Sequence, residues 1–152
     1  MKKILKLGVS RIRQLFSKKF VVVGVPVIIV NPKKEILLGK RSFKQIFYPG
    51  FWGLPGGLVE FRESFEEAAK REVYEELGVR IKIIKQLENY EALPIKSFPI
   101  HAMNVPFRAK IIKGKPKPKD ETSEVKWFKP SEIKKMKLAY KHKEILKREK
   151  LI

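Results

Sequence analysis

The sequence predicts a single α/β domain in which a mixed β-sheet lies between helices. Three observations carry this prediction. A run of mostly β-branched apolar residues spans 20–30, which is typical of a buried strand. A segment with helical spacing and signals at both of its ends spans 64–78. Further strand-like runs follow that segment, and a second helical region lies near the end of the chain.

The composition limits the chemistry that the chain can perform. Its length of 152 residues suits one domain, and a hydrophobic content of 43% is enough for a core. No run of 18 apolar residues is present, so no transmembrane helix is expected. The absence of cysteine excludes disulfides and thiolate nucleophiles. With only His101 and His142 as imidazoles, a bound metal would rely on oxygen ligands, which favours Mg²⁺ or Mn²⁺.

The formal net charge of +19 has two explanations. A strongly basic protein attracts polyanions such as nucleotides, nucleic acids or an acidic membrane surface. The excess is mostly lysine, however, and this composition also resembles that of proteins from hot environments.

Residues 1–19 are expected to form a basic amphipathic helix outside the main domain, which would span residues 20–152. The segment has helical apolar spacing and no acidic residue. It lacks the continuous apolar stretch of a signal peptide, so a cytoplasmic protein is expected. The helix would dock on the domain or pair with a second copy in a homodimer, or alternatively contact RNA or a membrane surface.

The first half of the domain begins with the strand over 20–30. Residues 31–34 (Asn-Pro-Lys-Lys) predict a turn, and residues 35–41 the second arm of a hairpin. Residues 42–52 form a loop with five aromatic side chains. We expect Phe51 and Trp52 to serve mainly in packing.

A helix follows, with Ser64 and Glu67 as a capping box and Gly78 as its C-terminal stop. Strands are then expected over 80–87, 100–112 and 125–128, with a Lys/Pro-rich loop over 113–120. Ser131 is expected to cap a last helix, with a break, that runs to the basic C-terminus.

Three glutamates occupy an unusual arc of the central helix. At about 100° per residue, Glu72, Glu75 and Glu76 overlap the apolar stripe of that helix. Carboxylates near a core face repel one another and lose hydration, unless a cation neutralises them. The alternative is that they are solvated and pair with Lys70 and Arg71.

The segment before the helix supports the first interpretation. Gly56 and Gly57 allow a backbone to approach a ligand closely. Glu63 precedes the helix cap, and Arg71 lies two turns into the helix. An ion pair between these two residues would hold the loop over the glutamates.

At this point the residues resemble a known family. Residues 57–79 match the Nudix box, G-x5-E-x7-R-E-U-x-E-E-x-G-U with U an aliphatic residue, at every specified position. The matching residues are Gly57, Glu63, Arg71, Glu72, Val73, Glu75, Glu76, Gly78 and Val79. The resemblance covers roughly residues 20–133. It implies an α/β/α sandwich and metal-dependent hydrolysis of a nucleoside diphosphate linked to another moiety.

The resemblance also implies roles for individual residues. Glu72, Glu75 and Glu76 would be metal ligands, with a backbone carbonyl from Gly56, and Mg²⁺ or Mn²⁺ would be the cofactor. Glu63 and Arg71 would be the structural ion pair. These expectations agree with the physical argument from the helix.

The general base varies within the family, so several candidates remain. A box glutamate, Glu75 or Glu76, is one option, and a carboxylate on the loop before Trp127 is another. Glu121 is the preferred loop residue, with Asp120 and Glu124 as alternatives. Arg41 is expected to contact phosphate, with Lys40 as its alternative, although either side chain could simply lie on the surface.

The substrate is less well defined by the sequence. Pro94 stands near the position at which a proline tends to follow the box in ADP-ribose pyrophosphatases of the family. ADP-ribose or a nucleotide sugar is therefore the first hypothesis. A (deoxy)nucleoside triphosphate pyrophosphohydrolase is the second. The third is an RNA-binding or RNA 5′-end-processing protein that uses the basic termini.

Overall fold

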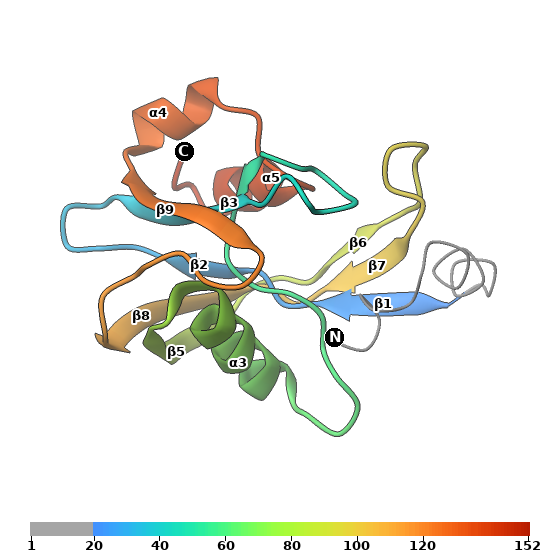
Figure 1. Cartoon of the computed structure of the whole chain (residues 1–152), viewed down its shortest axis with the longest axis horizontal. Coiled ribbons are helices and arrows are strands. Elements are labelled where there is room, and N and C mark those ends of the chain that lie inside the picture. Colours follow the sequence, from blue (N-terminus) through green and yellow to red (C-terminus); the bar gives the residue numbers. More distant parts are fainter. Residues whose placement is uncertain (1–19) are drawn as a thin grey trace.

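The computed structural model describes residues 20–152, so the helix predicted over residues 1–19 lies outside the described residues. Strands form the middle of the domain, with α3 on one side and α4 and α5 on the other (Figure 1). The strands are β1 (Val21–Gly24), β2 (Val27–Ile29), β3 (Ile36–Arg41), β4 (Trp52–Gly53), β5 (Arg80–Gln86), β6 (Tyr90–Ala92), β7 (His101–Asn104), β8 (Phe107–Lys113) and β9 (Thr122–Phe128). The helices are α3 (Phe65–Leu77), α4 (Pro130–Lys135) and α5 (His142–Arg148). This arrangement confirms the predicted α/β class.

Two of the predicted strands are each divided by a proline. The run over 20–30 becomes β1 and β2 on either side of Pro26, and the run over 100–112 becomes β7 and β8 on either side of Pro106. Proline has no N–H to donate, so the ladder is interrupted at each position. The two broken strands lie side by side in parallel, with β1 on β7 and β2 on β8. The prediction of continuous strands was wrong at these two residues.

The other pairings are antiparallel. The strands of residues 20–152 form three sheets, of which β1-β7-β6 and β2-β8-β5 are mixed, as predicted, and β4-β3-β9 is antiparallel. β5 pairs with β8, β6 with β7, and β3 with both β4 and β9. The predicted hairpin between residues 20–30 and 35–41 was wrong, because only an isolated bridge joins Val30 to Ile36 and β3 takes its main partners elsewhere. The strand β6 was not predicted, since its three residues are too few for a period to be recognised.

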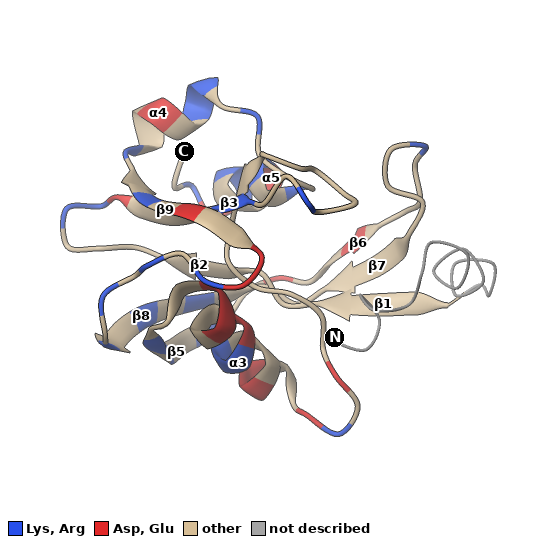
Figure 2. Cartoon of the chain, in the orientation of Figure 1, with Lys and Arg blue, Asp and Glu red and all other residues tan. Residues whose placement is uncertain are grey.

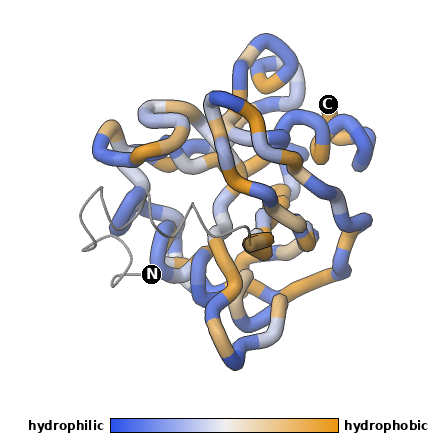
Figure 3. The backbone as a smooth tube through the Cα atoms, turned by 90° about the vertical axis from the view of Figure 1, so that its right-hand side faces the viewer, coloured by the Kyte–Doolittle hydropathy of each residue, from blue (hydrophilic) through white to orange (hydrophobic). Residues whose placement is uncertain are grey.

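The core has one apolar cluster on each side of the strands. Ala69, Val73 and Leu77 of α3 pack against β2, β5 and β8 on one side. Ile133, Ile145 and Leu146 of the C-terminal helices pack against β2 and β3 on the other. The end formed by β1, β6 and β7 faces the viewer in Figure 3, where apolar and hydrophilic stretches alternate along the chain. Exposed apolar side chains occur there, including Val21, Leu93 and Ile95.

The C-terminal region differs from the prediction at its start. Lys129, and not Ser131, is the N-cap of α4, and Pro130 occupies the first helical position. Proline suits that position because the first N–H of a helix has no partner within the helix. The predicted break is present between α4 and α5. None of the helices in residues 20–152 is long and apolar enough to cross a lipid bilayer.

Candidate active site

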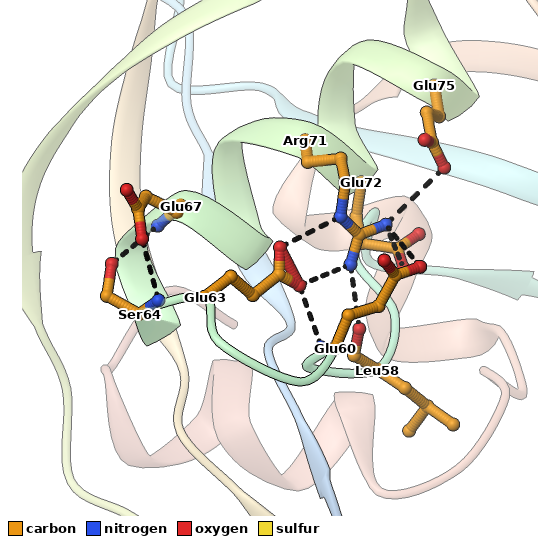
Figure 4. A network of polar contacts seen from close by, with 8 residues as sticks. All are labelled: Leu58, Glu60, Glu63, Ser64, Glu67, Arg71, Glu72 and Glu75. Carbon is orange, nitrogen blue, oxygen red and sulfur yellow. Dashed lines mark hydrogen bonds and ion pairs between the residues drawn. The ribbon is translucent and has the colours of Figure 1, made fainter. Parts of the chain in front are cut away.

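The helix α3 begins and ends where the sequence predicted. The Ser64 side chain accepts a hydrogen bond from the Glu67 N–H at 3.2 Å, and the Ser64 N–H donates to the Glu67 carboxylate at 2.7 Å (Figure 4). Gly78 ends the helix in the left-handed conformation, at φ 68°. These caps fix the ends of the helix, and the packing of Ala69, Val73 and Leu77 into the core fixes the direction in which its glutamates point.

Arg71 joins the loop to the helix. Its Nε and Nη2 donate to the two Glu63 oxygens at 3.0 and 2.7 Å, and Nη2 also donates to the Leu58 carbonyl at 2.9 Å (Figure 4). This two-pronged contact lowers the pKa of Glu63 below its usual range and raises the pKa of Arg71. The structure thus brings together the two residues expected to form the ion pair.

Glu72 is the most deeply buried carboxylate of α3, at 2% exposure. Its Oε1 accepts from Arg71 Nη1 at 2.9 Å. Burial raises the pKa of Glu72, and the Arg71 hydrogen bond opposes this effect. The carboxylate lies against Gly57, where a Cβ atom would come within 2.3 Å of the Glu72 carboxyl carbon. Gly57 is therefore needed because Glu72 occupies the space that a side chain would fill.

Glu76 lies one turn further along the same face. Its Oε2 accepts a hydrogen bond from the Gly56 N–H at 3.1 Å. Burial raises the pKa of Glu76 to about 8; the Gly56 N–H and Arg41 oppose this rise, and Glu72 and Glu121 add to it. Gly56 adopts φ +134°, and a Cβ there would lie 2.2 Å from the Val25 carbonyl oxygen. The two glycines thus allow the backbone of the loop to lie close to the carboxylates of α3.

Glu75 differs from the other two glutamates. Its side chain is 44% exposed, and it lies 3.5 Å from Arg71 Nη1. It is therefore at the outer edge of the carboxylate group, although its charge still acts on Glu72.

The three loop carboxylates are separated by the structure. Glu121 lines the cavity described below, and its charge raises the pKa values of Glu72 and Glu76. Glu124 instead forms a 2.7 Å ion pair with Lys40. Asp120 is exposed and is not among the cavity-lining residues. Of the three, only Glu121 stands beside the helix carboxylates.

Arg41 and Lys40 are separated in the same way. Arg41 lines the cavity, where its Nε donates to the Phe47 carbonyl at 2.9 Å and its guanidinium lies 5.1 Å from the centre of the Tyr140 ring. Lys40 is held on the outside by Glu124. The cation that faces the carboxylates is therefore Arg41.

A cavity of about 620 Å³ joins these groups. Glu72, Glu76, Glu121 and Arg41 line it together with aromatic side chains, and the Arg41 guanidinium lies beside the Tyr140 ring. Tyr140 contacts Tyr48 and Phe98 at ring-centre distances of 4.7 and 5.1 Å. Phe98 and Tyr140 were not predicted from the sequence, because each lies in a loop without local periodicity and reaches the cavity only through the fold.

His142 supports the loop at residues 54–57, which we call the glycine loop, through a hydrogen bond. Its buried Nδ1 accepts a hydrogen bond from the Leu54 N–H at 2.9 Å. Burial lowers the pKa of His142 to about 3, so the ring is neutral and carries its proton on Nε2. The role of this residue was not predicted, since a histidine at the start of a short helix has no local signal.

The donor chemistry of this site fits a hard divalent cation. Among residues 20–152, no three His, Asp or Glu side chains stand ready in a metal-binding arrangement. However, Glu72 and Glu76 both have raised pKa values, and the charge of Glu72 contributes to the rise at Glu76. Carboxylates held in this way accept a cation whose remaining ligands are waters and substrate phosphates.

The fold and the site define a class of protein: an α/β/α hydrolase with a carboxylate-bearing helix beside a cavity large enough for a nucleotide. A family model for the NUDIX domain matches residues 21–148, and the chain belongs to this family. It is therefore an enzyme of the pyrophosphohydrolase type, as the resemblance implied.

Known relatives cover much of the chain. It is 34% identical over 119 residues to an ADP-ribose pyrophosphatase of Methanocaldococcus jannaschii, covering 78% of this chain and 68% of that protein. It is 31% identical over 104 residues to the NAD-capped RNA hydrolase NudC of Pseudomonas aeruginosa, covering 67% of this chain but only 34% of that protein. The crystal structure of a MutT NUDIX hydrolase from Burkholderia pseudomallei superposes with a TM-score of 0.76 at 27% identity, covering 85% of this chain and 98% of that one.

Proposed function

We propose that the enzyme hydrolyses the phosphoanhydride bond of a nucleoside diphosphate linked to a sugar, with ADP-ribose or a nucleotide sugar as the substrate class. The observation that carries this proposal is that charged and aromatic side chains line one cavity. Carboxylates and Arg41 line it together with Tyr48, Phe98 and Tyr140. The charged groups suit a diphosphate with its cation, and the aromatic rings suit a nucleobase or a sugar face.

Within this proposal, Glu72, Glu75 and Glu76 would hold Mg²⁺ or Mn²⁺ together with the Gly56 carbonyl. The cation would polarise the phosphate oxygens and lower the pKa of a water. Arg41 would bind a phosphate oxygen. Its guanidinium is already oriented by the Phe47 carbonyl and by Gln45 at 3.2 Å, so little ordering is needed on binding.

Glu121 is the proposed general base. It shares the cavity with Glu72 and Glu76 and is partly exposed, so a water can reach it. It would take a proton from the attacking water while the phosphoanhydride P–O bond breaks. For ADP-ribose the products would be AMP and ribose 5-phosphate.

The relative from M. jannaschii supports ADP-ribose over the alternatives, because that protein is an ADP-ribose pyrophosphatase and its match extends over most of this chain. Pro94 adds to this only modestly, since proline is also an ordinary turn residue.

The test is a phosphate-release assay with excess Mg²⁺, with and without chelator. ADP-ribose, nucleotide sugars, dinucleoside polyphosphates and (deoxy)nucleoside triphosphates are each offered, and a phosphatase is added where the products carry only phosphomonoesters. Chelator-sensitive cleavage of ADP-ribose or a nucleotide sugar in preference to the others is expected. Preferential cleavage of a triphosphate would replace the proposed substrate class, and cleavage that survives the chelator would contradict metal dependence.

A matched pair of variants tests the site itself. Glu76→Gln should remove most activity. Glu66→Gln makes the same chemical change in the same helix, at an exposed residue paired only loosely with Lys70 at 3.7 Å, and should leave activity unchanged. Near-normal turnover of Glu76→Gln at saturating Mg²⁺ would refute its role as a ligand.

A further inference from the structure

The strands β5 and β8 place cations directly opposite one another. Arg80 faces Lys113, Lys82 faces Lys110 and Lys85 faces Arg108. We call these six residues the basic ladder. All except Arg108 are exposed. Like charges directly opposite across two strands are destabilising, so this arrangement works against the stability of the strand pair.

Few acidic side chains neutralise the charge of the basic ladder, which is therefore mostly exposed to solvent. Within residues 20–152, Lys85 is its only member in an ion pair, with the Glu149 carboxylate at 3.8 Å. Arg80 lies over the Tyr74 ring, with its guanidinium 5.2 Å from the ring centre. A region of concentrated, weakly neutralised positive charge remains, as Figure 2 shows by the blue segments of β5 and β8.

The loop after β8 carries this charge toward the cavity. Residues 114–119 contain three more lysines and no acidic residue. The loop crosses the end of α3, where the Lys117 and Lys119 N–H groups donate to the carbonyls of Leu77 and Glu76 at 3.0 and 2.9 Å. Two residues later Glu121 lines the cavity. A basic path therefore leads from the ladder to the site of hydrolysis.

Protection of a sheet edge explains only part of this pattern. β5 is the edge strand of its sheet, and lysine on an edge strand discourages pairing with other chains. β8, however, lies between β2 and β5 and has no free edge, yet it supplies Arg108, Lys110 and Lys113. The cations of β8 therefore require another explanation.

We infer that the basic ladder and the loop over 114–119 bind a single-stranded RNA chain through its phosphates. Phosphate contacts from Lys and Arg supply most sequence-independent binding to nucleic acids. A single strand fits because Ile84 and Ile112 stand at the β-bulges of the strand pair, 56% and 61% exposed, and offer apolar surface to unpaired bases. The path ends at a cavity proposed to bind nucleotides. The inference itself does not depend on hydrolysis.

The test is fluorescence anisotropy of the full chain with a labelled single-stranded RNA that carries a 5′-hydroxyl group, so that the outcome is separate from any cleavage. Nine phosphate contacts, one for each cation of the ladder and of the loop over 114–119, predict that log Kd changes with log salt with a slope of about 6. Replacing Lys82, Lys110 and Lys113 with Gln should lower this slope to about 4 and weaken low-salt binding at least tenfold.

The control replaces Lys33, Lys135 and Lys137 with Gln, which removes the same charge from exposed lysines in the β2–β3 turn and around α4. Its Kd for RNA should lie within about twofold of that of the unmodified chain, because the charges removed lie outside the proposed binding surface. Equal losses in the two variants, or no loss in the first, would overturn the inference. So would the absence of RNA binding, or binding to vesicles containing phosphatidylserine in place of RNA. Circular dichroism melts establish that both variants are folded.

Discussion

Replacing Glu76 with Gln should remove most activity and at the same time stabilise the metal-free protein. Folding raises the pKa of Glu76 from its ordinary value of 4.5 to about 8. The folded state therefore holds a proton that the unfolded state has released between these two pH values. The stability that this proton provides is complete below pH 4.5 and is lost as the pH rises through 8.

The size of the effect follows from the shift. A change of about 3.5 pKa units corresponds to an upper limit of about 5 kcal/mol. The side chain is partly exposed, and solvent screening should reduce this to roughly 2 kcal/mol. In a chain of this length that difference amounts to about 4–8 °C in Tm. A glutamine side chain cannot ionise, so the variant should not lose stability in this way as the pH rises.

The assay is urea denaturation of both proteins in chelator at pH 5 and at pH 9. The advantage of the Glu76→Gln variant should grow as the pH rises. Excess Mg²⁺ at pH 9 should stabilise the unmodified protein more than the variant, because a bound cation neutralises the ionised carboxylate. An advantage that is the same at both pH values would show that Glu76 is not desolvated as the structure indicates.

Three further predictions concern neighbouring residues. Arg41→Ala should lower kcat/KM about 10–100-fold through loss of a charge-assisted phosphate contact, whereas Lys40→Ala should change it less than about threefold; equal effects in steady-state assays would count against the assignment. Gly57→Ala should lower kcat at least tenfold and reduce Tm, because its Cβ would lie 2.3 Å from the Glu72 carboxyl carbon; a fully active variant would contradict this. For His142, whose folded pKa of about 3 lies below its ordinary 6.5, stability is present above pH 6.5 and is lost as the pH falls toward 3. Urea titrations should therefore show that the free energy of unfolding falls by about 2 kcal/mol between pH 7 and pH 5, and that the fall is smaller in the His142→Gln variant. The same fall in both proteins would refute the prediction.

Local patterns in the sequence were sufficient for the helix and its ion pair. The capping residues, the Glu63–Arg71 spacing, and Glu72 and Glu76 all lie within one continuous segment, so helical geometry alone relates them. Glu75, expected on the same arc, instead lies at the outer edge. The preferences for Arg41 over Lys40 and for Glu121 over Glu124 had no such local support, because neighbours in a strand point to opposite faces and the face depends on tertiary packing. The structure supplies it: Arg41 and Glu121 line the cavity, whereas Lys40 and Glu124 pair outside it.

The strand connections were harder to predict because they depend on contacts between distant residues. Pro26 and Pro106 each divide a run of residues that resembles one continuous strand. The two prolines lie next to one another, so β1 and β7 belong to one sheet and β2 and β8 to another. The hairpin predicted around residues 31–34 does not form, because β3 pairs with β9, which lies far along the chain. The aromatic side chains that line the cavity likewise come from loops that are distant in the sequence.

The hydrogen bond from Leu54 to His142 also has a consequence for synthesis. Translation proceeds from the N-terminus, so residues 54–57 leave the ribosome long before the residue that supports them. Tyr140, which lines the cavity, also leaves the ribosome long after these residues. A nascent chain can form the helix and its ion pair early, but its glycine loop gains this support only after residue 142 has emerged. Hydrolytic activity should therefore not appear before residue 142 has left the ribosome.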